Sequence, residues 1–259
     1  MFLQRSLFVA GLLLAGCGPP TSEPSTDAAG RADRLGVPRD TIVKLKQRLT
    51  IEDFDRQFAQ FESVFWDPAD TISLRKRIRE QSLAEKRVLE IGTGTGLLSL
   101  CCVQAGAAHV VATDINPSAI ANADYNAESL DYSPRLDLRF VSTDNPGAYA
   151  VIGDNEQFDL IISNPPWEDG KPEKYAEFAY YDEDFALLDS LLKDVRKHLT
   201  TGGRVWLAYG CVEAIRTAQR LAEKYSLNVA ILDDRELGDL ENLFLPGMLL
   251  EISPAKVAR

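Results

Sequence analysis

Residues 88–100, VLEIGTGTGLLSL, join two apolar runs through a glycine turn. The first run, 88–91, predicts a buried strand, and the second, 97–103, is long enough to begin a helix. Gly92, Gly94 and Gly96 occupy alternate positions between them. A strand that leads through such a turn into a helix leaves backbone N–H groups unpaired at the helix N-terminus. The stretch therefore predicts an α/β protein with a site for an anionic or polar ligand at this turn.

The spacing of the glycines separates this turn from other nucleotide-binding turns. Dinucleotide-binding folds favour G-x-G-x-x-G, whereas this turn is G-x-G-x-G, with Glu90 two residues before the first glycine. The pattern resembles motif I of class I S-adenosylmethionine-dependent methyltransferases. The resemblance implies that S-adenosyl-L-methionine binds here, with Glu90 under its methionine end. The turn residues that would contact the cofactor are Gly92, Thr93, Gly94 and Gly96.

The composition limits the kind of protein. The chain has 259 residues, 45% of them hydrophobic, which suits one sizeable domain with accessory segments. Its formal net charge of −11 disfavours nucleic acid as a partner, because an acidic surface gains nothing from counterion release. The two histidines, His109 and His198, have no partner at metal-ligand spacing, so no metal site is predicted.

The first 17 residues have the layout of an export signal. Arg5 supplies a short positive region, and residues 6–16 are almost wholly apolar but too few to span a bilayer. Leu14-Ala15-Gly16-Cys17 resembles the lipobox of bacterial lipoproteins. This resemblance implies a signal peptide over 1–16, lipid on Cys17 and a protein anchored to the membrane. The alternative is a misassigned start and a cytoplasmic protein.

Two segments separate this leader from the glycine turn. Residues 17–40 are rich in Pro, Gly, Ser, Thr and Ala, which predicts a flexible linker. Residues 41–85 predict a helical N-terminal extension that packs on the main domain, with its last helix over 71–86. Its apolar residues recur at helical spacings, as Ile42, Leu45 and Leu49 and then as Phe54, Phe58, Phe61 and Phe65. The resemblance to methyltransferases implies that such a segment flanks the cofactor mouth, so a part in covering it is the alternative.

Strands and helices alternate through residues 86–259. The expected strands are 88–91, 109–113, 136–141, 159–163, 204–209, 227–232 and 248–252, with helices at 117–130, 182–199 and 212–225. This alternation predicts an α/β fold in which helices cover both faces of a parallel sheet. It resembles the Rossmann-like seven-stranded sheet of class I methyltransferases, whose last strand is antiparallel, so 86–259 is the expected methyltransferase domain.

Two aspartates follow the second and third strands. Asp114 comes 22 residues after Gly92, and a carboxylate at that strand end can accept both ribose hydroxyls of a nucleoside. Asp144 matches the family position that contacts the adenine amino group, although a turn-forming role accounts for it nearly as well. The resemblance therefore assigns both carboxylates to the cofactor.

Asn164-Pro165-Pro166-Trp167 follows directly after the fourth strand. It resembles the [Asn/Asp/Ser]-Pro-Pro-aromatic motif of methyltransferases that modify planar amino nitrogens. Such a nitrogen is a weak nucleophile because its lone pair is delocalised. The Asn164 side-chain oxygen and the Pro165 carbonyl can each accept one N–H, which turns the lone pair toward the sulfonium methyl. The two prolines stiffen the turn, and Trp167 offers a face on which a planar group can stack. The resemblance also places Asn164 against the cofactor.

The expected reaction is direct in-line transfer of the methyl group to this nitrogen. It needs no covalent cysteine, and Cys101, Cys102 and Cys211 are expected to be small core residues. Their spacing is not that of disulfide partners. Unpaired cysteines and a cofactor made in the cytoplasm both conflict with export.

The charge of the segment after this motif favours one class of methyl acceptor over another. Residues 168–189 contain eight acidic residues against two lysines, and such a rim repels phosphate. A protein glutamine or a small molecule with an amine or amide is therefore favoured over a nucleic-acid base. The acidic residues are Glu168, Asp169, Glu173, Glu177, Asp182, Glu183, Asp184 and Asp189.

Two other classes of function remain as alternatives. A nicotinamide-dependent oxidoreductase would share the strand–turn–helix pattern, but the glycine spacing and the NPPW sequence disfavour it. A lipid-tethered protein that binds S-adenosylmethionine without catalysis would not need the intact NPPW sequence.

Overall fold

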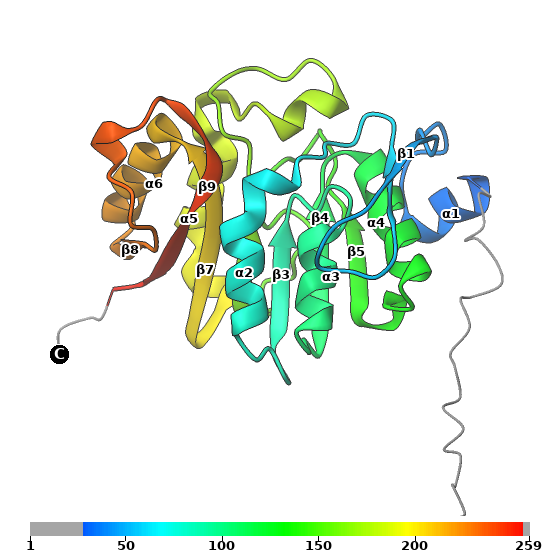
Figure 1. Ribbon diagram of the computed structural model, residues 1–259, viewed down its shortest axis with the longest axis horizontal. Helices are drawn as coiled ribbons and strands as arrows, with labels where there is room; N and C mark the ends of the chain where they lie inside the picture. Colours follow the sequence, from blue (N-terminus) through cyan, green and yellow to red (C-terminus); the bar gives the residue numbers. More distant parts are fainter. Residues whose placement is uncertain (1–27, 256–259) are drawn as a thin grey trace, which may run out of the picture.

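A seven-stranded sheet forms the centre of the computed structural model, which describes residues 28–255 (Figure 1). Its strands are β3 (Arg87–Ile91), β4 (His109–Asp114), β5 (Leu136–Phe140), β6 (Phe158–Ser163), β7 (Leu199–Cys211), β8 (Leu227–Ile231) and β9 (Leu243–Pro254). They lie in the order β5-β4-β3-β6-β7-β9-β8. The five strands β3, β4, β5, β6 and β7 are parallel to one another. Strand β9 is antiparallel to both of its neighbours, β7 and β8. The predicted sheet and its antiparallel last strand are confirmed.

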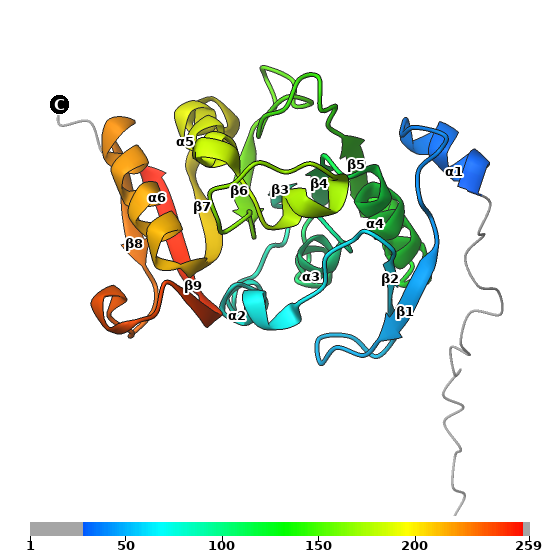
Figure 2. The same cartoon turned by 90° about the horizontal axis from the view of Figure 1, so that it is seen from above.

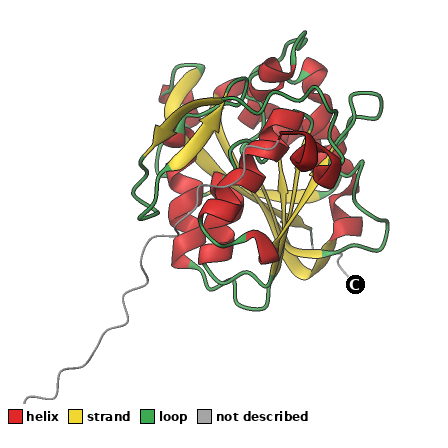
Figure 3. Ribbon diagram, turned by 90° about the vertical axis from the view of Figure 1, so that its right-hand side faces the viewer, coloured by secondary structure: helices red, strands yellow, loops and turns green. Residues whose placement is uncertain are grey.

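Helices cover both faces of this sheet (Figures 2 and 3). Helices α2 (Ile72–Glu80) and α3 (Leu97–Gln104) pack on one face, and α5 (Ala186–His198) and α6 (Val212–Lys224) pack on the other. Helix α4 (Pro117–Ser129) contacts β4 and β5. Short 3-10 helices lie at Pro68–Thr71, Ser133–Arg135, Tyr175–Ala179, Glu183–Phe185 and Leu237–Asp239.

The central strands are buried on both faces, which explains why their sequences are continuous apolar runs. On β3, Leu89 and Ile91 pack with residues of α5 and α6, whereas Val88 packs with residues of α2 and α3. Arg87 at the start of this strand is exposed, whereas Glu90 is only 1% exposed. A buried carboxylate within an apolar strand marks the end of the sheet where chemistry is expected.

The helices predicted over 41–65 are wrong. The segment instead contains an antiparallel hairpin of β1 (Leu45–Leu49) and β2 (Phe58–Phe61), and β2 packs on α4. The backbone N–H groups of Ala59 and Phe61 donate to the side-chain oxygens of Asn126 and Asn122, each at 2.8 Å. Two asparagines one turn apart on α4 thus replace a neighbouring strand, and no spacing of apolar residues reveals such a partner.

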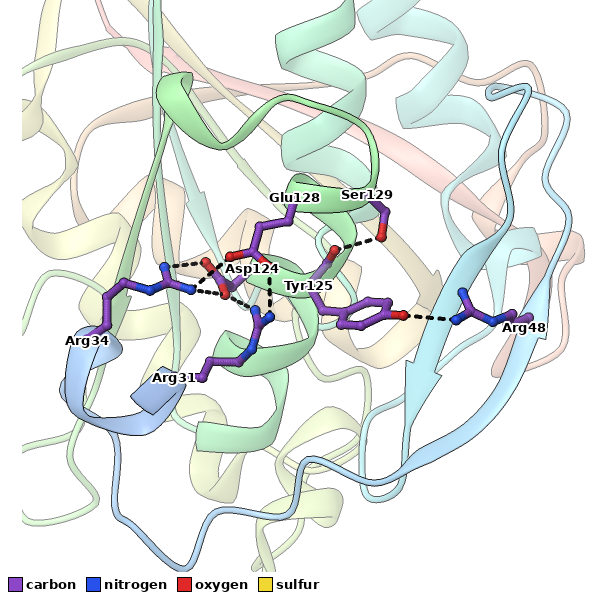
Figure 4. A network of polar contacts seen from close by, with 7 residues as sticks. All are labelled: Arg31, Arg34, Arg48, Asp124, Tyr125, Glu128 and Ser129. Atoms are coloured by element: carbon purple, nitrogen blue, oxygen red, sulfur yellow. Dashed lines mark hydrogen bonds and ion pairs between the residues drawn. The ribbon is translucent and has the colours of Figure 1, made fainter. Parts of the chain in front are cut away.

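The predicted linker over 17–40 is wrong for residues 28–35. Residues 28–35 form the helix α1 (Ala28–Leu35), which lies beside α4 (Figure 4). Arg31 and Arg34 both bind the buried carboxylate of Asp124, and both also reach Glu128. The acidic side chains of α4, which is distant in the sequence, therefore order a segment whose composition is that of a linker.

The predicted signal peptide and Cys17 lie outside the described residues. Within residues 28–255, no helix is long and apolar enough to cross a membrane. The same part of the chain has no group of three or more His, Cys, Asp or Glu side chains that could hold a metal ion. Cys101, Cys102 and Cys211 are buried, which confirms them as core residues.

Candidate active site

A cavity of about 450 Å³ opens at the carboxyl ends of the parallel strands. Its walls are the segments that follow β3, β4, β5 and β6, together with two covering segments at 64–71 and 171–187. Ligands of open α/β sheets bind at this edge. The predicted site residues that line the cavity are Glu90, Gly92, Thr93, Gly94, Asp114, Asn164, Pro165 and Pro166.

The glycine turn has the geometry that the sequence indicates. Gly92 and Gly94 have φ angles of +79° and +55°, and a Cβ on either would meet nothing within 4 Å. Because both line the cavity, their missing side chains leave the backbone open to a ligand. Gly96 has another purpose, since a Cβ there would lie 3.0 Å from the Cβ of Ala123 on α4. It lets the turn pack on α4 and does not itself line the cavity.

Glu90 lies beneath this turn. Its Oε2 accepts hydrogen bonds from Thr93 Oγ1 at 2.8 Å and from the Ser99 backbone N–H at 3.1 Å, and it also contacts the Ser99 hydroxyl. Burial raises the pKa of Glu90 to about 8, although these hydrogen bonds lower it. A carboxyl that is largely protonated near neutral pH is stabilised in its ionised form when a cation binds beside it.

Asp114 lies at the tip of β4 and connects the second strand to the glycine turn. Its Oδ2 accepts the Gly94 backbone N–H at 2.8 Å, and its Oδ1 accepts the Asn116 N–H at the same distance. Burial raises the pKa of Asp114 to about 6, while these backbone hydrogen bonds lower it. A third backbone hydrogen bond comes from Ile115, and the acceptor capacity that the carboxylate has left is available to a ligand in the cavity.

Asp144 is exposed, and the cavity is lined on that side by Val141, Pro146 and Gly147 instead. Its backbone N–H donates to the Ser142 hydroxyl at 3.2 Å, in a turn. The turn-forming role that the sequence allowed is therefore present, and contact with adenine stays a prediction.

Asn164, Pro165 and Pro166 lie at the tip of β6 and line the cavity as predicted. Trp167 does not line it. The indole instead packs against the backbone of Gly210 on β7, and its Nε1–H donates to Asn164 Oδ1 at 3.1 Å. In this arrangement Trp167 does not present a stacking face to the cavity, although the sequence led us to expect one. Its indole nitrogen is instead hydrogen-bonded to Asn164 of the same motif.

The segment 168–185 covers the cavity, visible as the yellow-green loop above the strand ends in Figure 1. Glu168 pairs with residues 180–182 through the Tyr180 and Asp182 backbone, which closes the base of this loop. Tyr180 meets Phe65 edge to face, with ring centroids 5.3 Å apart. The expected covering role of the N-terminal extension is therefore carried by residues 64–66, which line the cavity.

The acidic residues of this segment have different roles. Asp182 is buried and accepts the backbone N–H groups of Leu187 and Leu188, so it caps α5. Asp189 pairs with Lys224. Among the eight predicted rim residues, Asp182 and Glu183 line the cavity. The charge that faces an approaching acceptor is therefore smaller than the sequence count indicates.

Sequence reasoning missed Asp70. It lies in the 3-10 helix Pro68–Thr71, is 7% exposed, and hydrogen-bonds to the side chain of Asn164. Burial and the nearby Asp67 raise the pKa of Asp70 to about 7, while the hydrogen bond from Asn164 lowers it. An aspartate in the sequence Asp67-Pro68-Ala69-Asp70 looks like an ordinary turn residue, so its signal was present but not specific.

The residues of the cavity fit S-adenosylmethionine. The open backbone at Gly92 and Gly94 admits a ligand, Asp114 can accept hydroxyl hydrogens, and Glu90 can balance an ammonium group. The fold and this site define an S-adenosylmethionine-dependent methyltransferase. The chain belongs to the family of the methyltransferase small domain, whose profile matches residues 66–226.

Several relatives with known names are similar to this chain. A release factor glutamine methyltransferase of Cereibacter sphaeroides is 32% identical, over 67% of this chain and 68% of its own length. A Methanocaldococcus jannaschii protein assigned as an N5-glutamine methyltransferase is 35% identical, over 54% of this chain and 69% of its own. A tRNA1(Val) (adenine(37)-N6)-methyltransferase of Shewanella halifaxensis is 27% identical, over 56% and 58%.

Solved structures share the fold. The ribosomal protein L11 methylase of Lactobacillus delbrueckii aligns with a TM-score of 0.53 at 20% identity, over 74% of this chain and 82% of that one. The 16S rRNA N2 G1207 methyltransferase of T. thermophilus, solved with AdoMet and guanosine, gives 0.57 at 18% identity, over 85% and 52%.

Proposed function

We propose that this enzyme transfers the methyl group of S-adenosylmethionine to a planar amide or amino nitrogen, with a protein glutamine or a small molecule favoured as acceptor. One observation carries the proposal: Asn164, Pro165 and Pro166 line the same cavity as the glycine turn and Asp114. Acceptors for two N–H groups thus share a cavity with the residues suited to the cofactor.

The chemistry follows from these positions. The oxygen of Asn164 and the carbonyl of Pro165 are fixed on a turn that two prolines stiffen. An acceptor –NH₂ that donates to both oxygens presents its lone pair out of its plane, and the nitrogen becomes positive as the methyl group arrives. Two preorganised oxygens stabilise that positive charge without reorganisation.

The choice of acceptor rests on the covering segment and on the relatives. Asp169, Glu173, Glu183 and Asp184 are exposed there, against Lys171 and Lys174, which opposes the approach of a phosphate backbone. Two of the named relatives modify glutamine, but another modifies a tRNA adenine. A nucleic-acid base is therefore the alternative acceptor, and binding of the cofactor without catalysis is the alternative function.

The test incubates the purified protein with methyl-tritiated S-adenosylmethionine and an extract of the cells that make it. We expect label in a protease-sensitive fraction or in small molecules, and acid hydrolysis of a labelled glutamine amide would release methylamine. Label in a nuclease-sensitive fraction would establish the base alternative. Cofactor binding with no transfer to any fraction would establish the non-catalytic alternative. In Asn164→Ala we expect loss of transfer with cofactor affinity within about twofold.

We also propose that the protein is anchored to the membrane through lipid on Cys17. The support is the order of the short signal: a positive residue, an apolar run and then Leu14-Ala15-Gly16-Cys17. Buried cysteines such as Cys101 do not oppose export strongly, because inaccessible thiols do not react. Fractionation of cells that make the native protein and Cys17→Ser tests this: the native protein is expected with membranes. Recovery of both at full length in the soluble fraction would contradict it.

A further inference from the structure

The Asn164 side chain at the tip of β6 lies between Trp167 and Asp70 of the 3-10 helix Pro68–Thr71. Trp167 Nε1–H donates to Asn164 Oδ1 at 3.1 Å, and the Asn164 side chain also interacts with the Asp70 carboxyl, whose pKa it lowers. Because Oδ1 accepts from the indole, Nδ2 is the amide atom left to face Asp70. An amide can rotate by 180° and exchange its oxygen and nitrogen, but these two partners admit one orientation.

Trp167 and the backbone of Asp70 pack closely against two glycines of the sheet, Gly210 and Gly247. A Cβ on Gly210 of β7 would lie 2.3 Å from Trp167 Cζ3. A Cβ on Gly247 of β9 would lie 2.6 Å from the Asp70 carbonyl oxygen and 3.4 Å from Trp167 Cζ2. The backbone at the ends of two antiparallel strands thus supports both partners of Asn164. Close approach of this kind requires glycine.

From this geometry we infer that Trp167 and Asp70 are positioning residues, which hold the Asn164 amide with its oxygen in the orientation that an acceptor N–H requires. Trp167 acts through its N–H edge and not through its ring face. The inference rests on the proposed function, since the orientation of Asn164 matters only if Asn164 receives the acceptor.

Fixing this amide has a physical consequence for the reaction. A carbonyl oxygen has two lone pairs, so Oδ1 can accept from Trp167 and from the acceptor together. The Asp70 carboxyl lies on the Nδ2 side of the amide, and its negative charge, when it is ionised, favours the orientation in which Oδ1 stays free for the acceptor. If the amide were free to rotate, its nitrogen would face the acceptor N–H for part of the time and repel it.

The first test observes the hydrogen bond without any acceptor. The chain has three tryptophans, so three indole N–H signals are expected in a ¹⁵N-correlated NMR spectrum, each assigned by its Trp→Phe variant. In Asn164→Ala, the Trp167 signal should shift and exchange with D₂O about tenfold faster, because its acceptor is gone. The Trp206 signal should stay, since that indole donates to Glu251. An unchanged Trp167 signal would overturn the inference.

The second test uses the transfer of tritiated methyl groups to the cell extract. Trp167→Phe keeps a ring and removes the N–H, and we expect an approximately tenfold lower rate with S-adenosylmethionine affinity within about twofold. Trp206→Phe is the matched control and should keep the rate. Asp70→Ala should lower the rate, whereas Asp70→Asn should restore most of it, because its amide oxygen can still accept from Asn164.

A double-mutant cycle separates positioning from stacking or general stability. Asn164→Ser keeps an oxygen but is too short to meet Trp167, so adding Trp167→Phe to it should have no further effect on the rate. Additive losses would mean that Trp167 acts independently of Asn164 and would overturn the inference. If Asn164→Ala keeps the full rate, the proposed function is what fails, and the NMR result still decides whether the network exists.

Discussion

Asn126 on α4 donates from its side-chain nitrogen to the Thr95 carbonyl of the glycine turn at 2.9 Å. The same side chain accepts the Ala59 backbone N–H at 2.8 Å and donates to the Ala59 carbonyl at 2.9 Å. One buried asparagine therefore holds the N-terminal hairpin and the cofactor turn together. Residues 64–66, which follow the hairpin and line the cavity, take their position from this connection.

Asn126→Ala should destabilise the fold and weaken cofactor binding. The substitution removes the side-chain partner of the Ala59 N–H and of the Thr95 carbonyl, whereas the Ala59 carbonyl still accepts from Asn122. The expected cost is about 3 kcal/mol in the free energy of unfolding. Urea denaturation measures the loss. Asn228→Ala, on an exposed position of β8, is the matched control and should change stability by less than about 0.5 kcal/mol. Equal stability of the two variants would show that the connection is dispensable.

Asp114→Ala should weaken S-adenosylmethionine binding by about 1.5–3 kcal/mol, because charge-assisted hydrogen bonds to the ribose are lost. The loss of the Gly94 contact loosens the turn in addition. Isothermal titration calorimetry measures both this variant and Asp144→Ala. We expect a smaller effect for Asp144, since its carboxylate is exposed and solvent screens it. An Asp114→Ala protein with native affinity would remove this residue from the site.

Glu90 should make the stability of the ligand-free protein fall as the pH rises. Its pKa is about 8 in the folded state against 4.5 without burial, so folding takes up a proton between these values. Relative to Glu90→Gln, the native protein should therefore lose up to about 1.4 kcal/mol per pH unit from pH 4.5 to pH 8 and then level off. Urea denaturation across this range tests the slope; a constant difference between the proteins would show that Glu90 is ionised throughout.

Arg31→Ala should destabilise the protein more than Arg34→Ala. Both guanidinium groups bind Asp124, but the Arg31 side chain is 5% exposed and that of Arg34 is 52% exposed (Figure 4). Breaking the buried pair costs about 3 kcal/mol, whereas an exposed pair contributes about 1 kcal/mol or less. Chemical denaturation of both variants checks the order. The reverse order would mean that α1 is not held to α4 by this pair.

Gly210→Ala should lower methyl transfer without abolishing cofactor binding. The new Cβ would lie 2.3 Å from both Trp167 and the Phe244 carbonyl oxygen, so the indole must move away from Asn164. Gly238→Ala is the control, because a Cβ there meets nothing within 4 Å. Transfer to the extract and calorimetry with S-adenosylmethionine measure the two effects. A Gly210→Ala protein with native transfer would show that the position of the indole is unimportant.

The sequence by itself determined the elements whose signal is local. The strand–turn–helix at 88–103, the glycines, Asp114 at a strand end and the Asn164-Pro165-Pro166 turn each follow from short-range pattern. Parallel strands that are buried on both faces are mostly apolar, so β3 and β6 can be recognised in the sequence. Because the carboxyl ends of parallel strands meet at one edge, these separate signals also converge in space.

Tertiary structure alone decided the features that depend on distant partners. The phenylalanines at 54–65 fit a helical spacing, but Asn122 and Asn126 pair with the backbone of β2 and make it a strand. Composition predicts a linker at 28–35, but Asp124 draws two arginines into a helix. Trp167 belongs to a motif that predicts stacking on the acceptor. Because Gly210 has no side chain, the Trp167 ring packs against the Gly210 backbone instead, and the indole N–H donates to Asn164. In each case the residue that decides the local structure lies more than 40 positions away in the sequence. A local sequence pattern contains no information about such a distant partner.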